Sequence, residues 1–268
     1  MLLSLAGSGK LVSAHALARV LRVRTLAVPY HLDEHLPDLD LPLATAGVVA
    51  ADLAPGDPWR RMAVLYGQLA DAVAGVVASG AVPLVQSGDC TTALGTVAGL
   101  QRAGSDPGVV WCDAHGDLHT PATTASGYLG GMPLRLLLGA CPELIGTSLG
   151  LRPVPEDQVL LVGARDLDPP EVSFLAGAAI RRSEVAALDP ATLPTGPLYV
   201  HLDADVIDPA EIAGLRFPAP RGPGRADVAA ALRVLLGTGR VVAVGLACTW
   251  RPGHGAAAAM APVLAALA

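Results

Sequence analysis

Asp113, His115 and Asp117 follow the apolar run Val109–Cys112 at two-residue spacing. In extended backbone, residues two apart point to the same side, so this spacing predicts that the three side chains converge. Carboxylates and an imidazole gathered on one side repel one another or lack partners unless a cation joins them. The alternative interpretation is a polar loop in which the aspartates cap turns without binding an ion.

A second acidic pair, Asp203 and Asp205, comes at the end of the apolar run Leu198–Leu202. Carboxylates that become buried at the end of a strand are costly unless they are paired or bind a metal. The competing interpretation is a hydrogen-bonded turn that ends at Asp208-Pro209. We expect Asp208 to play that structural part, which leaves Asp203 and Asp205 as candidate metal ligands.

Cys90 follows a third apolar run, Val82–Gln86, across a short turn. Gly88 permits a tight passage from strand to helix, and Asp89 or Thr91 is expected to cap that helix. The pKa of a thiol tends to fall at the start of a helix, which would suit a ligand or a nucleophile. A small buried residue is the more common role of a lone cysteine. A nucleophilic Cys90 with a histidine as base is a further hypothesis, but it leaves the aspartates unexplained.

Together the two acidic groups offer four carboxylates and one imidazole. An oxygen-rich set of this kind suits two divalent cations bridged by carboxylates, with Mn²⁺ favoured. Two ions about 3.5 Å apart can hold one water between them and convert it to hydroxide near neutral pH. The residues therefore predict a binuclear metal centre that activates water for hydrolysis.

Short Val- and Leu-rich runs alternate with longer Ala- and Leu-rich segments, a pattern typical of strands buried on both faces and of the helices that cover them. The predicted strands are Thr25–Val28, Gly47–Ala50, Val82–Gln86, Val109–Cys112, Val159–Val162, Ala178–Arg182, Leu198–Leu202 and Val241–Leu246. The predicted helices are Trp59–Ala78, Thr91–Arg102, Tyr128–Leu138, Pro169–Gly177, Arg225–Leu236 and Gly255–Leu267. This alternation predicts a three-layer α/β/α sandwich around a mainly parallel sheet of about eight strands, with ligands beyond the carboxyl ends of the strands.

The composition bounds the class of protein. The 268 residues are 52% hydrophobic and only 3% aromatic, so the core must be built from Ala, Val and Leu. We predict one domain over residues 23–268, preceded by a helix-prone extension at 1–22. The formal net charge of −6 with scattered basic residues argues against nucleic-acid binding. The apolar runs are too short for a membrane span, and no basic segment precedes the apolar start. Four cysteines in so long a chain do not suggest a disulfide scaffold. These observations predict a cytoplasmic protein.

The order of the three polar motifs resembles that of the arginase (ureohydrolase) superfamily. Members carry a Gly-Gly-Asp-His motif, a DAHxD motif and an SxDxDxxDP motif, and the counterparts here are Ser87–Cys90, Asp113–Asp117 and His201–Pro209. The resemblance is most specific over Ser87–Leu138 and covers about residues 23–268. It implies the arginase-like form of the sandwich fold, and a homo-oligomer that is a trimer or a hexamer.

The resemblance also implies a ligand set for two Mn²⁺ ions: Asp113 and Asp203 bridging both, His115 and Asp205 completing one site, and Asp117 completing the other with the residue at Cys90. Family members have a histidine where this chain has Cys90. A thiolate at that place would shift the preference towards Zn²⁺, Fe²⁺ or Co²⁺. If Cys90 does not bind, the altered site is weak or empty.

Two substitutions separate the chain from family arginases. Gly130 stands where the Ser-Gly-Asn-Leu-His-Gly stretch of arginases has its catalytic histidine, and Thr249 stands where they have a glutamate that pairs with the guanidinium. Threonine cannot form the charge-assisted bidentate pair that a guanidinium prefers. His119 or His254 is then the candidate for the missing proton relay, while Asp117 would steady the tetrahedral intermediate.

The positions that recognise an amino acid in arginases are partly kept. Thr124 and Ser126 would donate to a carboxylate, Asp168 would meet an α-ammonium, and His119 stands where arginases have asparagine. We therefore expect a hydrolase that acts on the carbon–nitrogen bonds of a linear amidine, a small guanidino or formimino compound resembling an amino acid, through a metal-bridging hydroxide. The alternative is a non-catalytic or regulatory relative that retains one metal or none.

Overall fold

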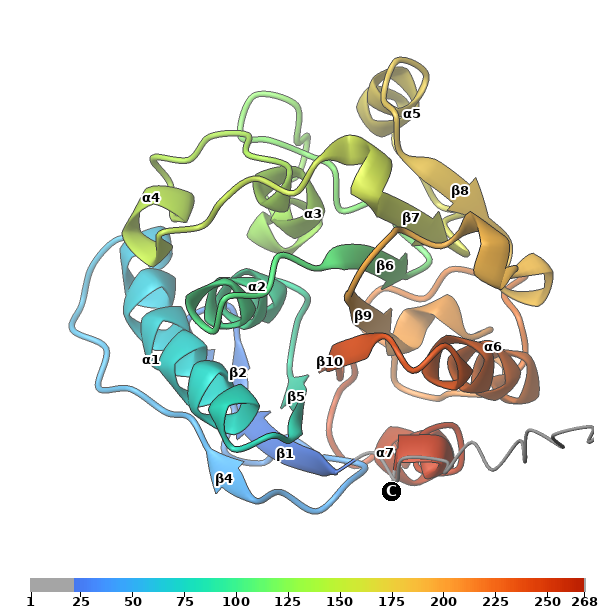
Figure 1. Ribbon diagram of the computed structural model, residues 1–268, viewed down its shortest axis with the longest axis horizontal. Helices are drawn as coiled ribbons and strands as arrows, with labels where there is room; N and C mark the ends of the chain where they lie inside the picture. Colours follow the sequence, from blue (N-terminus) through green and yellow to red (C-terminus); the bar gives the residue numbers. More distant parts are fainter. Residues whose placement is uncertain (1–21, 268) are drawn as a thin grey trace, which may run out of the picture.

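An eight-stranded parallel sheet forms the centre of the molecule (Figure 1). The computed structural model describes residues 22–267, so the predicted N-terminal extension, apart from Arg22, lies outside the described residues. The strands are β1 (Val23–Val28), β4 (Gly47–Val48), β5 (Val82–Ser87), β6 (Gly108–Cys112), β7 (Val159–Val162), β8 (Arg181–Ser183), β9 (Leu198–Asp203) and β10 (Val241–Ala247). Their order in the sheet is β4-β1-β5-β10-β9-β6-β7-β8, and each neighbouring pair is parallel.

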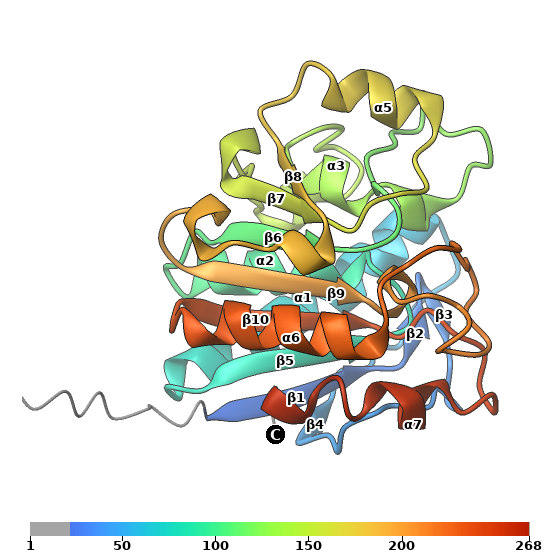
Figure 2. The same cartoon turned by 90° about the vertical axis from the view of Figure 1, so that its right-hand side faces the viewer.

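Helices cover both faces of this sheet, which confirms the predicted α/β/α sandwich (Figures 1 and 2). One face is covered by α1 (Pro58–Ala78), α2 (Thr92–Arg102), α3 (Pro133–Leu137) and α4 (Gly146–Leu149), and the other by α6 (Arg225–Gly237) and α7 (Ala256–Met260). A further helix, α5 (Pro169–Leu175), follows β7. Successive strand residues contribute to opposite hydrophobic clusters, since side chains alternate between the faces of a strand.

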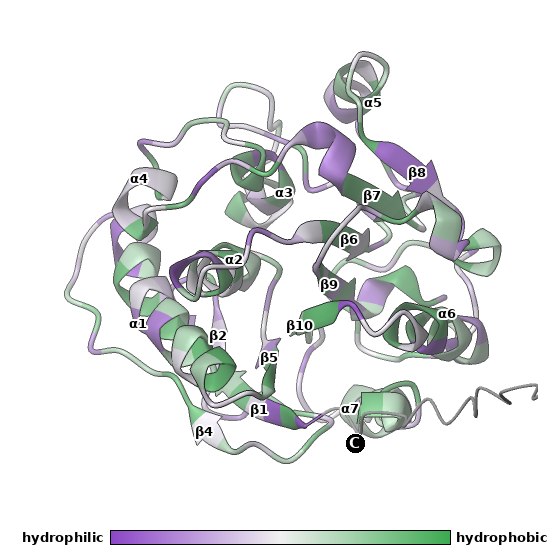
Figure 3. Cartoon of the chain, viewed as in Figure 1, coloured by the Kyte–Doolittle hydropathy of each residue, from purple (hydrophilic) through white to green (hydrophobic). Residues whose placement is uncertain are grey.

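Hydropathy distinguishes the inner strands from the edge strand β8 (Figure 3). The central strands β6, β7, β9 and β10 are mostly apolar (Figure 3), as expected where both faces are covered by helices. The edge strand β8 is polar and carries Arg181 and Arg182, and charged residues on an edge discourage pairing with another chain.

The helices α1 and α2 pack closely because α2 carries glycine at the contact. A Cβ atom at Gly95 would lie 2.9 Å from the Cβ of Tyr66, and one at Gly99 would lie 2.6 Å from the carbonyl oxygen of Ala70. Among the described residues, α1 is the one helix long and apolar enough to cross a membrane. Its apolar stripe, which includes Met62 and Leu69, is instead buried in the core.

The structure differs from the predicted elements where proline or tertiary contacts decide. Two stretches predicted as single helices are each divided: a 3₁₀ turn at Leu129–Gly131 precedes Pro133 and α3, and α7 ends at Met260 before Pro262. The hairpin of β2 (Tyr30–His31) and β3 (Glu34–His35) and the helix α4 were not predicted. After α7 the chain covers the sheet, because Val263, Leu264 and Leu267 are buried in the core beside α6.

The close contact between α1 and α2 makes a prediction about stability. We expect Gly99→Ala to lower the free energy of unfolding by about 1–3 kcal/mol, because the added methyl overpacks the contact. Gly75→Ala in α1 is the matched control, since a Cβ there meets nothing within 4 Å and alanine should stabilise a helix interior by about 0.5–1 kcal/mol. Urea unfolding measures both variants, and equal effects would contradict the assigned packing.

Candidate metal centre and pocket

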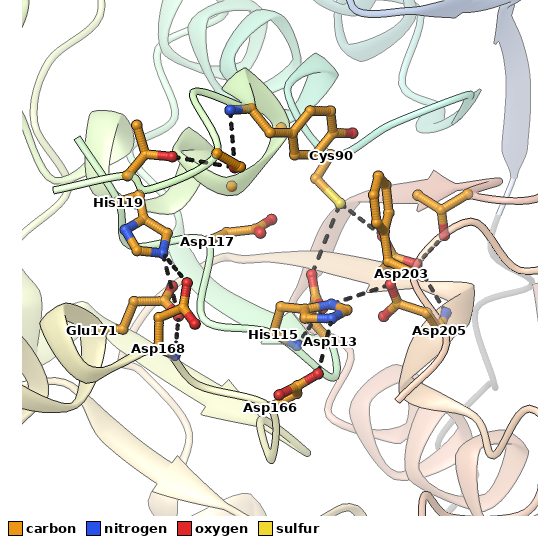
Figure 4. Close-up of a pocket in the computed structure, with 17 residues that line it drawn as sticks. Cys90, Asp113, His115, Asp117, His119, Asp166, Asp168, Glu171, Asp203 and Asp205 are labelled. Atoms are coloured by element: carbon orange, nitrogen blue, oxygen red, sulfur yellow. Dashed lines mark hydrogen bonds and ion pairs between the residues drawn. The ribbon is translucent and has the colours of Figure 1, made fainter. Parts of the chain in front are cut away.

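A pocket of about 460 Å³ lies beyond the carboxyl ends of the central strands (Figure 4). Strands β6 and β9 are neighbours, and Cys112 pairs with Leu202. Asp113 and Asp203 follow this pair, so they lie side by side at the carboxyl edge of the sheet. Both are buried and both line the pocket.

The predicted ligands on these two strand ends converge around His115. Its Nδ1 lies 3.2 Å from Asp205 Oδ2 and 3.4 Å from Asp113 Oδ1, while its Nε2 lies 3.8 Å from Asp166 Oδ2. One ligand atom each from His115, Asp113 and Asp205 lies within 4.8 Å of the other two. This spacing places three donors of suitable type around one point where an ion could bind.

The reason for the convergence is not the extended backbone that the two-residue spacing suggested. Asp117 has φ of 53°, in the left-handed region that non-glycine residues rarely adopt, so the loop turns after β6 instead of continuing straight. Asp113 Oδ1 accepts the backbone N–H of His115 at 2.7 Å, and Asp203 Oδ1 accepts that of Asp205 at 2.9 Å. Tight aspartate turns therefore aim the carboxylates, and the prediction of an extended loop was wrong.

Burial and mutual repulsion favour the protonated forms of Asp117, Asp203 and Asp205, whereas the hydrogen bond with His115 lowers the pKa of Asp113 in spite of its burial. Burial raises the pKa of Asp117 and of Asp203, and the neighbouring carboxylates raise both further. Burial and Asp113 raise the pKa of Asp205 to about 7. Burial alone would lower the pKa of His115, but its hydrogen bonds with Asp113 and Asp205 raise it to about 12. A proton on His115 thus supplies the positive charge that a metal ion would supply.

Asp117 carries the clearest mark of an absent partner. Its Oδ2 is buried, with no hydrogen-bond partner in the described part of the chain. An unsatisfied buried carboxylate oxygen is destabilising, and native structures retain one where an ion or a ligand binds. The left-handed backbone of Asp117 adds local strain of the kind that clusters at functional sites. The donor set and this orphaned oxygen both fit a divalent metal ion.

Cys90 lies against the same carboxylates. Its Sγ donates to Asp203 Oδ2 at 2.8 Å and lies 3.8 Å from Asp113 Oδ2. Burial, followed by the charges of Asp203 and Asp117, raises the pKa of the thiol well above its usual range. The predicted fall of that pKa at a helix start was wrong, because burial and carboxylates outweigh the start of α2. These surroundings disfavour a free thiolate nucleophile and suit a ligand that ionises only beside a metal.

A second polar group lies across the pocket on the loop after β6 and at the start of α5. His119 Nε2 lies 3.0 Å from Asp168 Oδ2 and 3.9 Å from Glu171 Oε2. Glu171, which the sequence analysis missed, accepts the backbone N–H of Leu118 and that of Asp168, each at 3.0 Å. The signal for Glu171 was present, since an acid three residues after a capping aspartate is typical of a helix start. Glu171 therefore ties the His119 loop to α5.

Thr124 and Ser126 line the outer part of the pocket, as the amino-acid-binding interpretation expects. The hydroxyl of Thr124 accepts the backbone N–H of Gly127 at 3.1 Å, and that of Ser126 accepts the N–H of Tyr128 at 3.2 Å. A hydroxyl that accepts a backbone bond keeps its own O–H free to donate. The two hydroxyls also lie 3.4 Å apart, so one can donate to the other while the remaining O–H can donate to an anionic group of a ligand.

Of the two remaining candidate residues, Thr249 lies in the pocket and His254 lies outside it. Thr249 is buried, lines the pocket and donates through Oγ1 to Asp203 Oδ1, so its hydroxyl proton is already used. The structure does not bring His254 to the pocket: it is exposed and lies against Gly214. The chain turns away after Thr249, because the N–H of Arg251 bonds to the Gly214 carbonyl. The prediction that His254 is a proton relay is therefore corrected.

Tyr128 fills the space that a side chain at position 130 would need. A Cβ atom added at Gly130 would overlap the Tyr128 phenol ring. The Tyr128 hydroxyl lies 3.3 Å from His31 Nε2, and its ring lies with its centroid 4.9 Å from that of Phe217. Burial and nearby acids raise the pKa of Tyr128, so it stays a neutral phenol. Sequence analysis missed Tyr128, His31 and Phe217, although the bulky Tyr128 beside glycines was a usable signal.

Comparison with known proteins then decides the family. The sequence model described as the Arginase family matches residues 8–252. The chain belongs to the arginase family. Among curated relatives, the arginase of Brevibacillus brevis is 33% identical over 169 residues, which cover 58% of this chain and 57% of that relative. The chain thus matches little more than half the length of this relative and of the next one, the arginase of Bacillus caldovelox.

Solved structures extend the likeness in fold over nearly the whole chain. The arginase from Bacillus cereus superposes with a TM-score of 0.78 at 23% identity, covering 91% of this chain and 97% of that one. The formimidoylglutamase from Bacillus subtilis superposes with a TM-score of 0.65 at 15% identity, covering 91% and 86%. Two differently named enzymes share this fold, so the fold by itself does not select a substrate.

The raised pKa values predict how the metal-free protein responds to pH. The folded Asp205 carboxyl binds a proton up to pH about 7, whereas its ordinary pKa is 3.8, so stability falls as pH rises between these values. The His115 contribution is complete below pH 6.5 and is lost as pH rises towards about 12.

We therefore expect the Tm of chelator-treated protein to fall as pH rises from about 4 to about 7, and to fall less in Asp205→Asn. Thermal unfolding across this pH range, with metal-loaded protein in parallel, measures the effect. A wild-type Tm that rises relative to that of Asp205→Asn over the same range would contradict the assignment of the acidic cluster.

Proposed function

We propose that this arginase-family protein is a metal-dependent hydrolase that acts on a carbon–nitrogen bond of a small linear amidine. The observation that carries the proposal is the buried acidic cluster at the ends of β6 and β9, in which Asp117 Oδ2 has no partner among the described residues. A cluster that must otherwise bind protons is suited to divalent cations. We also propose a cytoplasmic protein and a homo-oligomer, a trimer or hexamer.

Asp113 and Asp203 would be shared by the two proposed metal sites, of which His115 and Asp205 would complete one and Asp117 and Cys90 the other. When bound, a pair of divalent ions such as Mn²⁺ lowers the pKa of water and supplies a nucleophile near neutral pH. Thr249 holds Asp203 in place by donating to its Oδ1. Asp117 presents its unpartnered oxygen to the cavity, where it can accept a proton or a hydrogen bond from the reacting group.

Substrate recognition is proposed to come from the opposite wall. The hydroxyls of Thr124 and Ser126 would donate to a carboxylate, which would replace their contact with each other. The Asp168 side chain is 64% exposed even though His119 pairs with it, so it remains accessible to an ammonium group. A pocket of about 460 Å³ suits a molecule of amino-acid size. Guanidino, ureido and formimino derivatives of amino acids share this chemistry.

Arginine itself is expected to be a poor substrate. Thr249 has no charge and its proton is directed to Asp203, so it cannot pair with a guanidinium as a glutamate does. The Tyr128 ring fills the space above Gly130, which leaves no room there for an imidazole. A neutral or smaller amidine head group, such as a formimino group, therefore suits this end of the pocket better.

A non-catalytic relative is the second candidate, and the same two positions favour it. Without an imidazole at Gly130 and an acid at Thr249, the pocket could bind an amino-acid-like ligand without turning it over. This alternative expects saturable ligand binding with no product and one metal ion per chain or none.

Metal analysis with an activity panel separates the two candidates. We expect two equivalents of divalent metal per chain, hydrolysis of at least one guanidino, ureido or formimino compound, and loss of activity with a chelator. Asp117→Asn should lower kcat by at least about a hundredfold, because it removes a ligand and a proton acceptor. A fully loaded protein that binds these compounds but hydrolyses none would instead establish the non-catalytic candidate.

His119 is expected to be the proton relay, since its imidazole lines the pocket and pairs with Asp168. We expect His119→Ala to lower kcat by about a hundredfold, within the range for loss of a general acid or base. His254→Ala is the matched control and should leave kcat unchanged, because His254 lies outside the pocket. Steady-state kinetics on the best substrate of the panel measure both, and equal rates for His119→Ala and the wild type would remove His119 from this role.

A further inference from the structure

His201 is a buried histidine that the proposed centre does not use. It lies on β9 two residues before Asp203, so both side chains project from the same face of the strand. The His201 side chain is almost wholly buried, and its ring stacks on Trp111 with centroids 3.7 Å apart. Its Nδ1 lies 3.2 Å from the Tyr199 hydroxyl. Its Nε2 is buried and has no hydrogen-bond partner in the part of the chain that the structure describes.

The atoms beside His201 are metal ligands in kind. A ring nitrogen of His201, the sulfur of Cys90 and a carboxylate oxygen of Asp113 all lie within 4.8 Å of one another. Zn²⁺ binds thiolate sulfur at about 2.3 Å and imidazole nitrogen at about 2.0 Å, so three atoms this close can share one ion. A second carboxylate is at hand, because Asp203 Oδ2 lies 2.8 Å from the Cys90 sulfur.

Two departures from the family motifs meet at this point. The chain has Cys90 where the first motif has histidine, and His201 where the third motif has serine. Cys90 lies in the turn before α2, and His201 lies on β9. The fold therefore brings together two residues that differ from the family motifs and are 111 positions apart in the sequence. The first motif lacks its histidine in this chain, and His201 on β9 supplies an imidazole beside the same place. One site therefore accounts for both exchanges.

We propose that His201 and Cys90 supply the nitrogen and sulfur ligands of the metal site that Asp113, Asp117 and Asp203 complete, and that this site selects Zn²⁺ or Co²⁺ over Mn²⁺. The inference deepens the proposed metal centre, and rests on it for the second ion. Binding converts the Cys90 thiol to a thiolate and releases its proton to solvent, with no change of oxidation state. Thiolate and imidazole favour the softer ions, whereas an all-oxygen set favours Mn²⁺.

A purely structural role for His201 explains less. Stacking on Trp111 and the contact with Tyr199 account for one face and one nitrogen of the ring. They leave Nε2 buried without a partner among the described residues, and an unsatisfied buried nitrogen is destabilising. A ligand role gives that atom a partner.

Cobalt titration of the full-length, metal-free protein tests the proposal without reference to activity. We expect one equivalent of Co²⁺ to produce near-ultraviolet sulfur-to-cobalt charge-transfer absorption. Cys90→Ser should abolish this absorption, and His201→Ser should weaken Co²⁺ and Zn²⁺ binding by at least about tenfold. Cys112→Ser is the matched control: Cys112 is also buried at a strand end but packs in the hydrophobic cluster on the other face of the sheet, so its absorption should equal that of the wild type.

The double variant Cys90→His/His201→Ser tests the exchange directly. It places the imidazole and the hydroxyl where the family motifs have them, and it should reduce the preference for Zn²⁺ over Mn²⁺ in competition binding, because a soft sulfur ligand is lost. Because His201→Ser alters a buried ring stack, X-ray absorption of the zinc-loaded wild type provides a measurement that needs no variant. It should show one sulfur and imidazole scattering around zinc.

The outcomes separate this inference from the proposed function. Sulfur-to-cobalt absorption that depends on Cys90 and His201 supports the site even if no compound is hydrolysed. A wild type without that absorption, a His201→Ser variant that folds and binds Co²⁺ as tightly as the wild type, or zinc without sulfur or imidazole ligands would overturn it. Any of these results is compatible with a hydrolase that uses Mn²⁺ alone.

Discussion

The crowding of carboxylates at two neighbouring strand ends is the constraint on which the rest of the site depends. Because Cys112 pairs with Leu202 in a parallel register, Asp113 and Asp203 must emerge together into a buried space. Like charges so placed need either protons or a cation, and the hydrogen bonds of His115 show how a proton meets that need. Cys90, two residues before α2, donates to Asp203 beside the same charges.

Much of this arrangement could be predicted from the sequence, because strands buried on both faces must be apolar and the polar residues after them must meet at one edge. All eight strands of the sheet lie at or beside predicted runs. The environment of Cys90 could not be predicted, since its pKa depends on carboxylates from distant strands. Likewise His201 looks like an ordinary strand residue until the fold places one of its ring nitrogens near Cys90 and Asp113.

The pocket combines acidic motifs that resemble those of arginases with neighbouring residues that differ from them. Family membership covers residues 8–252, and the likeness to solved structures concerns the fold. The residues that differ lie around them: Tyr128 occupies the space above Gly130, and Thr249 bonds to Asp203 instead of facing a ligand with charge. A fold that keeps its acidic cluster while the surrounding pocket residues change can accept a different substrate without changes in the hydrophobic core.

Glu171 connects the loop after β6 to the start of α5 through two hydrogen bonds. One of its oxygens holds the N–H of Leu118, next to Asp117, and the other holds the N–H of Asp168 at the start of α5. Any movement of α5 towards an incoming molecule must therefore pull on the segment that carries Asp117. If the proposed metal centre depends on the position of Asp117, then ligand occupancy beside α5 and ion affinity at that centre influence each other by thermodynamic reciprocity.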